Sequence, residues 1–70
     1  MTTFTIDKNR LSEVALELYE LLQKIMPTEN DIIFVMALAK GDKNRQLVID
    51  FIKKNNPTAD EIEKFADERF

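Results

Sequence analysis

The side chains of this sequence that could do chemistry are mostly carboxylates near its end. Glu63 and Asp67 are four residues apart, and Asp60 lies on the same side of the helix expected there. Such a group could hold Mg²⁺ or Ca²⁺ through its oxygens. A solvated acidic helix face has the same pattern and is the interpretation we adopt. We therefore expect no metal site.

The residue types on which most enzymes rely are missing or isolated. The chain has no His and no Cys, so it lacks the usual general base, the thiol nucleophile and the ordinary ligands of zinc, haem and iron–sulfur clusters. Ser12 is the only serine and has no His to activate it. With Gly41 as its only glycine, the chain cannot form a glycine-rich phosphate loop. We expect a protein that is not an enzyme and that has no cofactor.

One short segment has side chains typical of nucleic-acid binding. Residues 40–54 carry five basic and two acidic side chains, net +3, whereas residues 1–39 and 55–70 each carry net −3. A helix after Gly41 could serve as the reading helix of a helix-turn-helix motif. Its candidate contacts to phosphates and base edges are Lys40, Lys43, Arg45 and Gln46.

Helix geometry favours a different interpretation of this segment. At about 100° per residue, the consecutive side chains 43–46 fan around the helix and cannot all enter one groove. Asp50 lies in the middle of the exposed face, where it would repel phosphates. The acidic segments on either side would also weaken attraction to nucleic acid. DNA binding through the helix after Gly41 is therefore kept as an alternative.

Capping residues and hydrophobic periodicity predict an all-α protein with one domain, residues 1–70. Asp7 and Asp42 suit the N-caps of the first and third helices, and Thr58 with Glu61 forms a capping box before the fourth. Gly41 can end the second helix in a left-handed conformation. The predicted fold is a compact bundle of four short helices at about 7–26, 28–40, 42–55 and 58–69.

The second predicted helix is apolar on every side. Eight apolar residues follow one another from Ile32 to Ala39, so we expect this helix to be central and covered by the other three. The third helix should face it with the stripe Leu47, Val48, Phe51 and Ile52.

Apolar side chains beyond one core stripe are found on the first and third helices and at Phe70. Leu16, Tyr19 and Met26 widen the apolar side of the first helix. Either two neighbouring helices cover this side, or it forms a patch for another protein. Aromatic, Met and Arg side chains are enriched in interface cores. The hypothetical patch consists of Leu16, Tyr19, Met26, Arg45, Ile49 and Phe70.

These patterns predict a small acidic protein-interaction or regulatory module that acts through an apolar helix surface. Its partner would be another protein or a second copy in a homodimer. A helix-turn-helix-like DNA-binding regulator is the alternative. A weaker alternative is an acidic inhibitor of a nucleic-acid-processing protein, based on Glu13, Glu17, Glu20 and the carboxylates of residues 60–68.

The sequence also bears on location. The longest apolar run is far too short to span a bilayer, and no basic segment leads into an apolar one near Met1. Cys, which is common in secreted small domains, is absent. We expect a cytoplasmic protein without a membrane segment.

Overall fold

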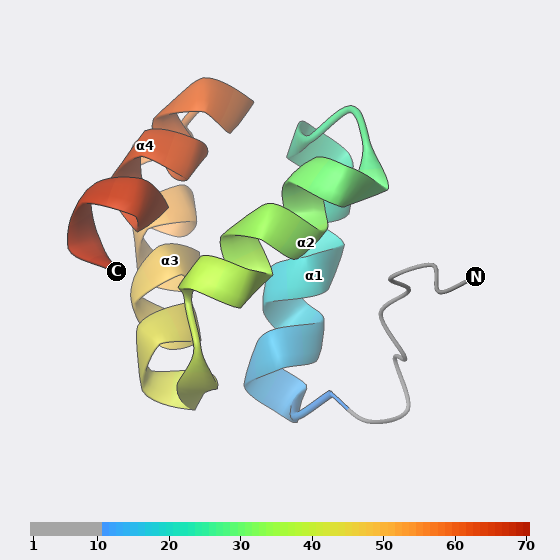
Figure 1. The fold of residues 1–70 in the computed structure, drawn as a ribbon, viewed down its shortest axis with the longest axis vertical. Helices are drawn as coiled ribbons and strands as arrows, with labels where there is room; N and C mark the ends of the chain where they lie inside the picture. The colour runs from blue at the N-terminus through green and yellow to red at the C-terminus, as the bar shows by residue number, and fades with distance from the viewer. Residues whose placement is uncertain (1–10) are drawn as a thin grey trace.

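A computed structural model describes residues 11–70, which form four α-helices with short connections (Figure 1). The predicted all-α bundle is confirmed, and no residue of this described range lies in a β-strand. None of the helices found there is long and apolar enough to cross a membrane. The helices are α1 (Glu13–Ile25), α2 (Glu29–Leu38), α3 (Gly41–Asn55) and α4 (Ala59–Arg69).

The four helices form a ring in which each packs against two others. α1 packs along α3, α3 contacts α4, α4 contacts α2, and α2 returns to α1. Successive helices run in opposite directions, up and down the bundle (Figure 1). α2 and α3 share few contacts although a short turn joins them. They therefore occupy opposite corners of the ring.

Threonine side chains start α2 and α4. The Thr28 hydroxyl oxygen accepts a hydrogen bond from the Asp31 N–H at 3.4 Å. The Thr58 hydroxyl oxygen accepts one from the Glu61 N–H at 3.3 Å, and the Glu61 carboxylate accepts one from the Thr58 N–H at 3.0 Å. The predicted capping box is confirmed. These bonds satisfy N–H groups that have no partner within the helix.

α1 begins at Glu13, six residues after the predicted start at Asp7, which lies outside the described residues. Ser12 is the N-cap, and its oxygen accepts a hydrogen bond from the Ala15 N–H at 3.2 Å. The same hydroxyl donates to the carboxylate of Asp42 on α3 at 2.6 Å. The Ser12 cap was not predicted from the sequence, and its contact with Asp42 ties the start of α1 to α3.

The predicted capping role of Asp42 is wrong. α3 begins at Gly41, its N-cap is Lys40, and no side chain caps it. Gly41 has φ +84°, the left-handed conformation that glycine adopts without strain. It stands at the start of α3, however, because α2 has already ended at Leu38. Asp42 lies in the first turn, where its charge suits the helix dipole and its carboxylate contacts α1.

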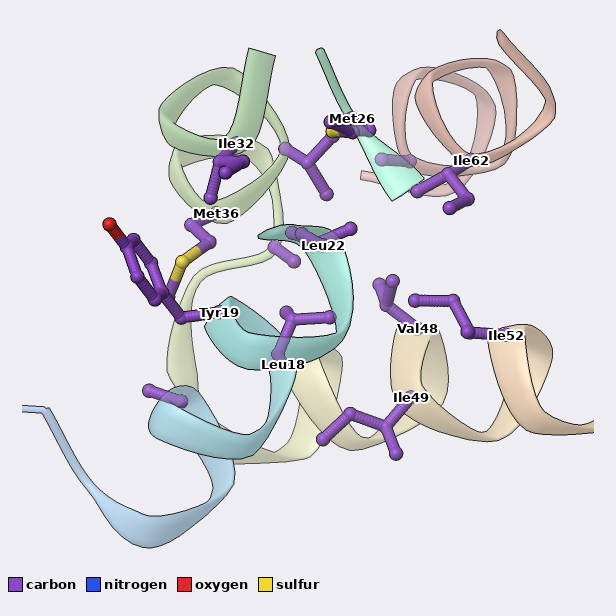
Figure 2. Packing of buried hydrophobic residues seen from close by; sticks show 14 residues of the cluster. Leu18, Tyr19, Leu22, Met26, Ile32, Met36, Val48, Ile49, Ile52 and Ile62 are labelled. Carbon is purple, nitrogen blue, oxygen red and sulfur yellow. The ribbon is translucent and has the colours of Figure 1, made fainter. Parts of the chain in front are cut away.

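The core contains apolar side chains from all four helices (Figure 2). No polar or charged side chain of residues 11–70 is buried, so burial of apolar area is the main source of stability. The buried apolar residues are Ala15, Leu18, Tyr19, Leu22, Met26, Ile32, Val35, Met36, Ala39, Val48, Ile49, Ile52, Ile62 and Ala66.

α2 is not covered on all sides, and the prediction that it is the central helix is wrong. Ile32, Val35 and Met36 are buried, but the side chain of Phe34 is 47% exposed and Ala37 is exposed. In a ring of four helices each helix has two neighbours, so the outer side of α2 faces solvent.

The side of α3 that enters the core is rotated from the predicted one. Val48 and Ile52 are buried as expected, but Ile49 is fully buried while Leu47 is 46% exposed and Phe51 is half-buried. α1 packs along α3 and closes off the side that carries Ile49. Leu47 is thereby left outside the core.

Adjacent residues of α2 provide a test of this orientation. We expect Val35→Asp to unfold the protein, because a carboxylate at a fully buried position has no partner and costs about 3 kcal/mol or more. Phe34→Asp, at the exposed neighbouring position, should keep the helical circular dichroism signal and a cooperative thermal transition. A folded Val35→Asp variant would contradict this placement of α2.

Candidate functional site

The structure places half of the hypothetical interaction patch inside the subunit. Tyr19, Met26 and Ile49 are 5%, 6% and 0% exposed. Their expected position on the surface is wrong, because α2 and α3 both pack against α1. The explanation that two neighbours cover the first helix is therefore the correct one. Leu16 is half-buried, and an interface at this residue stays a prediction.

Tyr19 joins the core to the α1–α2 corner. Its ring packs beside Met36, and its hydroxyl points outward (Figure 2). The hydroxyl donates a 3.4 Å hydrogen bond to the carboxylate of Glu29 in the first turn of α2. Burial, followed by the nearby charge of Glu29, raises the pKa of Tyr19 above its ordinary value. The phenol therefore stays neutral at physiological pH and acts as a structural donor.

Arg45 is half-buried and bonds to the backbone at the α2–α3 corner, and an interface at this residue stays a prediction. Its Nε donates to the carbonyl oxygen of Ala39 at 2.8 Å, and its Nη2 donates to that of Met36 at 3.1 Å. α2 has no basic residue in its own last turn, so Arg45 supplies the cation that suits a helix C-terminus. The guanidinium is thus used to hold the corner of the fold.

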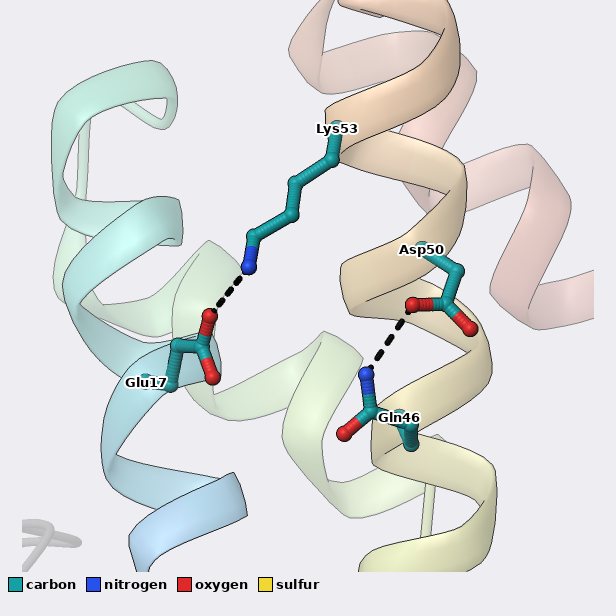
Figure 3. A network of polar contacts seen from close by, with 4 residues as sticks. All are labelled: Glu17, Gln46, Asp50 and Lys53. Carbon is teal, nitrogen blue, oxygen red and sulfur yellow. Dashed lines mark hydrogen bonds and ion pairs between the residues drawn. The ribbon is translucent and has the colours of Figure 1, made fainter.

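The other candidate nucleic-acid contacts lie near the start of α3 and do not share the corner role of Arg45. Lys40 and Lys43 are exposed. The Gln46 amide donates a 2.9 Å hydrogen bond to the carboxylate of Asp50, one turn later on α3 (Figure 3). The helices of a helix-turn-helix motif pack against each other, whereas α2 and α3 share few contacts.

An ion pair joins α1 to α3 across their outer edge. Lys53 Nζ lies 2.6 Å from the carboxylate of Glu17 (Figure 3). The hydrogen bond and charge of Glu17 raise the pKa of Lys53. Both side chains are about half exposed, at 58% and 45%, so the pair contributes little free energy. It nevertheless neutralises part of the acidic side of α1.

The carboxylate of Glu63 on α4 faces that of Asp31 on α2. Burial, then the charge and hydrogen bond of Asp31, raise the pKa of Glu63 above its ordinary value. No three acidic side chains within residues 11–70 converge in a geometry that could hold a metal ion. Repulsion between the two carboxylates therefore affects the stability of the α2–α4 contact.

A groove at one end of the bundle places the exposed Leu47 beside Leu38 and Phe70, which are half-buried and pack against the core. It has a volume of about 700 Å³ and lies between the end of α2, the start of α3 and the end of α4. We call it the Leu47 groove. Phe34 extends the apolar surface along α2, because it precedes Leu38 by one turn on the same side. The residues that line it are Leu38, Lys40, Asn44, Leu47, Arg69 and Phe70.

Aromatic stacking fixes the α4 wall of this groove. Phe51 and Phe65 meet edge to face with ring centroids 4.2 Å apart, and Phe65 stacks on Phe70 at 6.3 Å. The guanidinium carbon of Arg69 lies 4.6 Å from the centroid of the Phe65 ring. Phe70, a member of the hypothetical patch, therefore does line a surface groove, but with partners that the sequence analysis placed elsewhere.

Leu47 was not predicted as a surface residue because its position in the expected stripe of α3 assigned it to the core. The available signal was that Leu47 and Ile49 lie on opposite flanks of the stripe formed by Val48 and Ile52, and only the packing of α1 decides which flank is buried. Comparison with protein-family models, with curated proteins and with solved structures gives no match to this chain.

The role of Arg45 can be tested by replacing its charged group while keeping its apolar stem. We expect Arg45→Met to lower the free energy of unfolding by about 1–2 kcal/mol, because two carbonyl groups at the end of α2 lose a charged donor. Urea denaturation followed by circular dichroism measures this. Lys43→Met, at an exposed position nearby, should change stability by less than about 0.5 kcal/mol. Equal effects of the two would contradict the corner role.

The pair Asp31 and Glu63 predicts a pH dependence. The raised pKa of Glu63 means that the folded state binds its proton more tightly than the unfolded chain does, so the pair destabilises the fold at neutral pH. This penalty is relieved as the pH falls through the raised pKa. Glu63→Gln should therefore raise the melting temperature at pH 7. The free energy of unfolding should rise by less than about 1 kcal/mol.

The difference between Glu63→Gln and the wild type should shrink as the melts approach pH 4, where the native carboxyl is itself protonated. Glu20→Gln, which removes an exposed carboxylate from α1, serves as the control and should show no such trend. A melting temperature lowered by Glu63→Gln at pH 7 would show that the two carboxylates do not repel.

Proposed function

We propose that this protein is a small protein-interaction module that binds its partner through the Leu47 groove. The observation that carries this is the position of Leu47, a large apolar side chain that is 46% exposed beside the half-buried Leu38 and Phe70. Full burial of a Leu side chain is worth about 1.5–3 kcal/mol. A partner that covers the groove would recover the part of this free energy that folding leaves unused.

The walls of the groove support binding because they are held in place before a partner arrives. Three helices contribute to it, and Phe70 is fixed by stacking on Phe65, which in turn contacts Phe51. A site built on packed helices needs little ordering when it binds, and this lowers the entropic cost of association. The groove is also open, so extended or helical segments can enter it from solvent.

The two alternative functions have less support from the described residues. Two of the four candidate DNA contacts, Arg45 and Gln46, are engaged in hydrogen bonds within the subunit. The proposed acidic inhibitor would use the acidic side of α1, where Glu17 is paired with Lys53. The cytoplasmic location stays a prediction that follows from the sequence composition.

Site-specific photo-crosslinking in the native cell tests the proposal. Benzoylphenylalanine replaces Leu47 in one variant and Lys54 in another, both on α3 and both exposed. We expect discrete protein adducts from position 47 that are absent from position 54, and that disappear when Phe70→Asp is introduced. Equal labelling at both positions, or adducts that a nuclease removes, would contradict a protein partner in the groove.

A further inference from the structure

We infer that the Leu47 groove takes an acidic, amphipathic segment of a partner protein. Its apolar side chains would enter between Leu38, Leu47 and Phe70, and its carboxylates would meet Lys40 and Arg69. This inference rests on the proposed function and adds the chemistry of the partner.

The charge of the groove is opposite to that of the chain as a whole. The chain has 13 acidic and 10 basic side chains, net −3, yet none of the residues that line the groove is acidic. Lys40 and Arg69 are exposed, and neither forms an ion pair with any residue of the described range. Two cations without a carboxylate partner therefore stand beside an exposed apolar floor.

Other grooves on the surface have part of this combination, and one beside Met36 has a single cation, Arg45, which is bound to carbonyl groups. A groove of about 480 Å³ between α1 and α3 is lined by Lys24 and Lys53, but Glu17 already neutralises Lys53. A groove of about 360 Å³ beside Phe65 has charged residues of both signs. The Leu47 groove differs from these in having two cations without a carboxylate partner in residues 11–70, beside a large apolar side chain, Leu47, that is 46% exposed.

The composition of the groove favours a peptide over a nucleic acid. Phosphates could meet Lys40 and Arg69, but a phosphate backbone has nothing apolar to place against Leu38 and Leu47. An amphipathic helix has apolar side chains on one side and can place Asp or Glu one turn away on its edge. A volume of about 700 Å³ has room for a few such side chains.

A random 16-residue peptide library displayed on phage and selected against the full chain tests the inference. We expect the enriched sequences to combine apolar or aromatic residues at helical spacing with Asp and Glu beside them. Synthetic peptides with the enriched sequences are then titrated with the protein, and binding is measured by fluorescence anisotropy. Leu47→Glu should weaken their binding by about tenfold or more, since it places a charge at the centre of the contact.

Charge reversal separates the acidic preference from apolar contact. The double variant Lys40→Glu and Arg69→Glu should weaken binding by about threefold to tenfold and should lose most of its salt dependence. The matched control Lys24→Glu and Lys54→Glu makes the same change in net charge away from the groove and should bind like the wild type. Circular dichroism melts confirm that each variant is folded.

The outcomes distinguish the inference from the proposed function. Enriched peptides that lack acidic residues but still lose their binding to the Leu47→Glu variant would overturn the inference and leave the groove as a binding site. If no enriched peptide loses its binding to the Leu47→Glu variant, both the inference and the proposed function are overturned. A molar mass that doubles with concentration and falls to one subunit in Leu47→Glu would replace the acidic partner with a second copy of the chain.

Discussion

The packing of α1 along α3 determines which surface every other helix presents. α1 covers the side of α3 that carries Ile49, and a short ion pair between Glu17 and Lys53 lies at the outer edge of the same contact. Because α3 is held in this rotation, Leu47 cannot also reach the core. The ring closes through α4 and α2, which meet at the opposite side of the bundle. The groove is therefore a consequence of how two helices that are not consecutive in the chain pack together.

The α2–α3 corner depends on a contact of a different kind. α2 ends without a basic residue of its own, and two of the carbonyl groups near its end are met by the guanidinium of Arg45. Gly41 supplies the positive φ that lets the chain turn there. The same residues that resemble the turn and first contacts of a DNA-reading helix are thus used to shape a corner. The groove begins beside this corner, at Lys40 and Asn44.

The sequence predicted the helical fold well and the surface poorly, for one physical reason. Caps such as Thr58 with Glu61 are local, so residues three apart decide them and no distant contact is needed. Which apolar residue of a helix enters the core depends on neighbours that local patterns do not specify. This is why Ile49 is buried and Leu47 is exposed, the reverse of what the sequence predicted. Arg45 bonds to carbonyl groups six and nine residues earlier, a distance that no periodic pattern indicates.

Single exposed apolar side chains are normal in small domains, so the surroundings of Leu47 matter more than its exposure alone. The described core is entirely apolar and contains residues from all four helices, so Leu47 and Phe34 are not needed to complete it. A polar residue at either position would lose little stability and would lower the tendency to aggregate. Leu47 instead stands between a wall fixed by stacked aromatic rings and two cations that have no carboxylate partner in the described part of the chain. Apolar area, positive charge and a rigid frame in one place are the features that a binding surface uses and that a folded subunit by itself does not require.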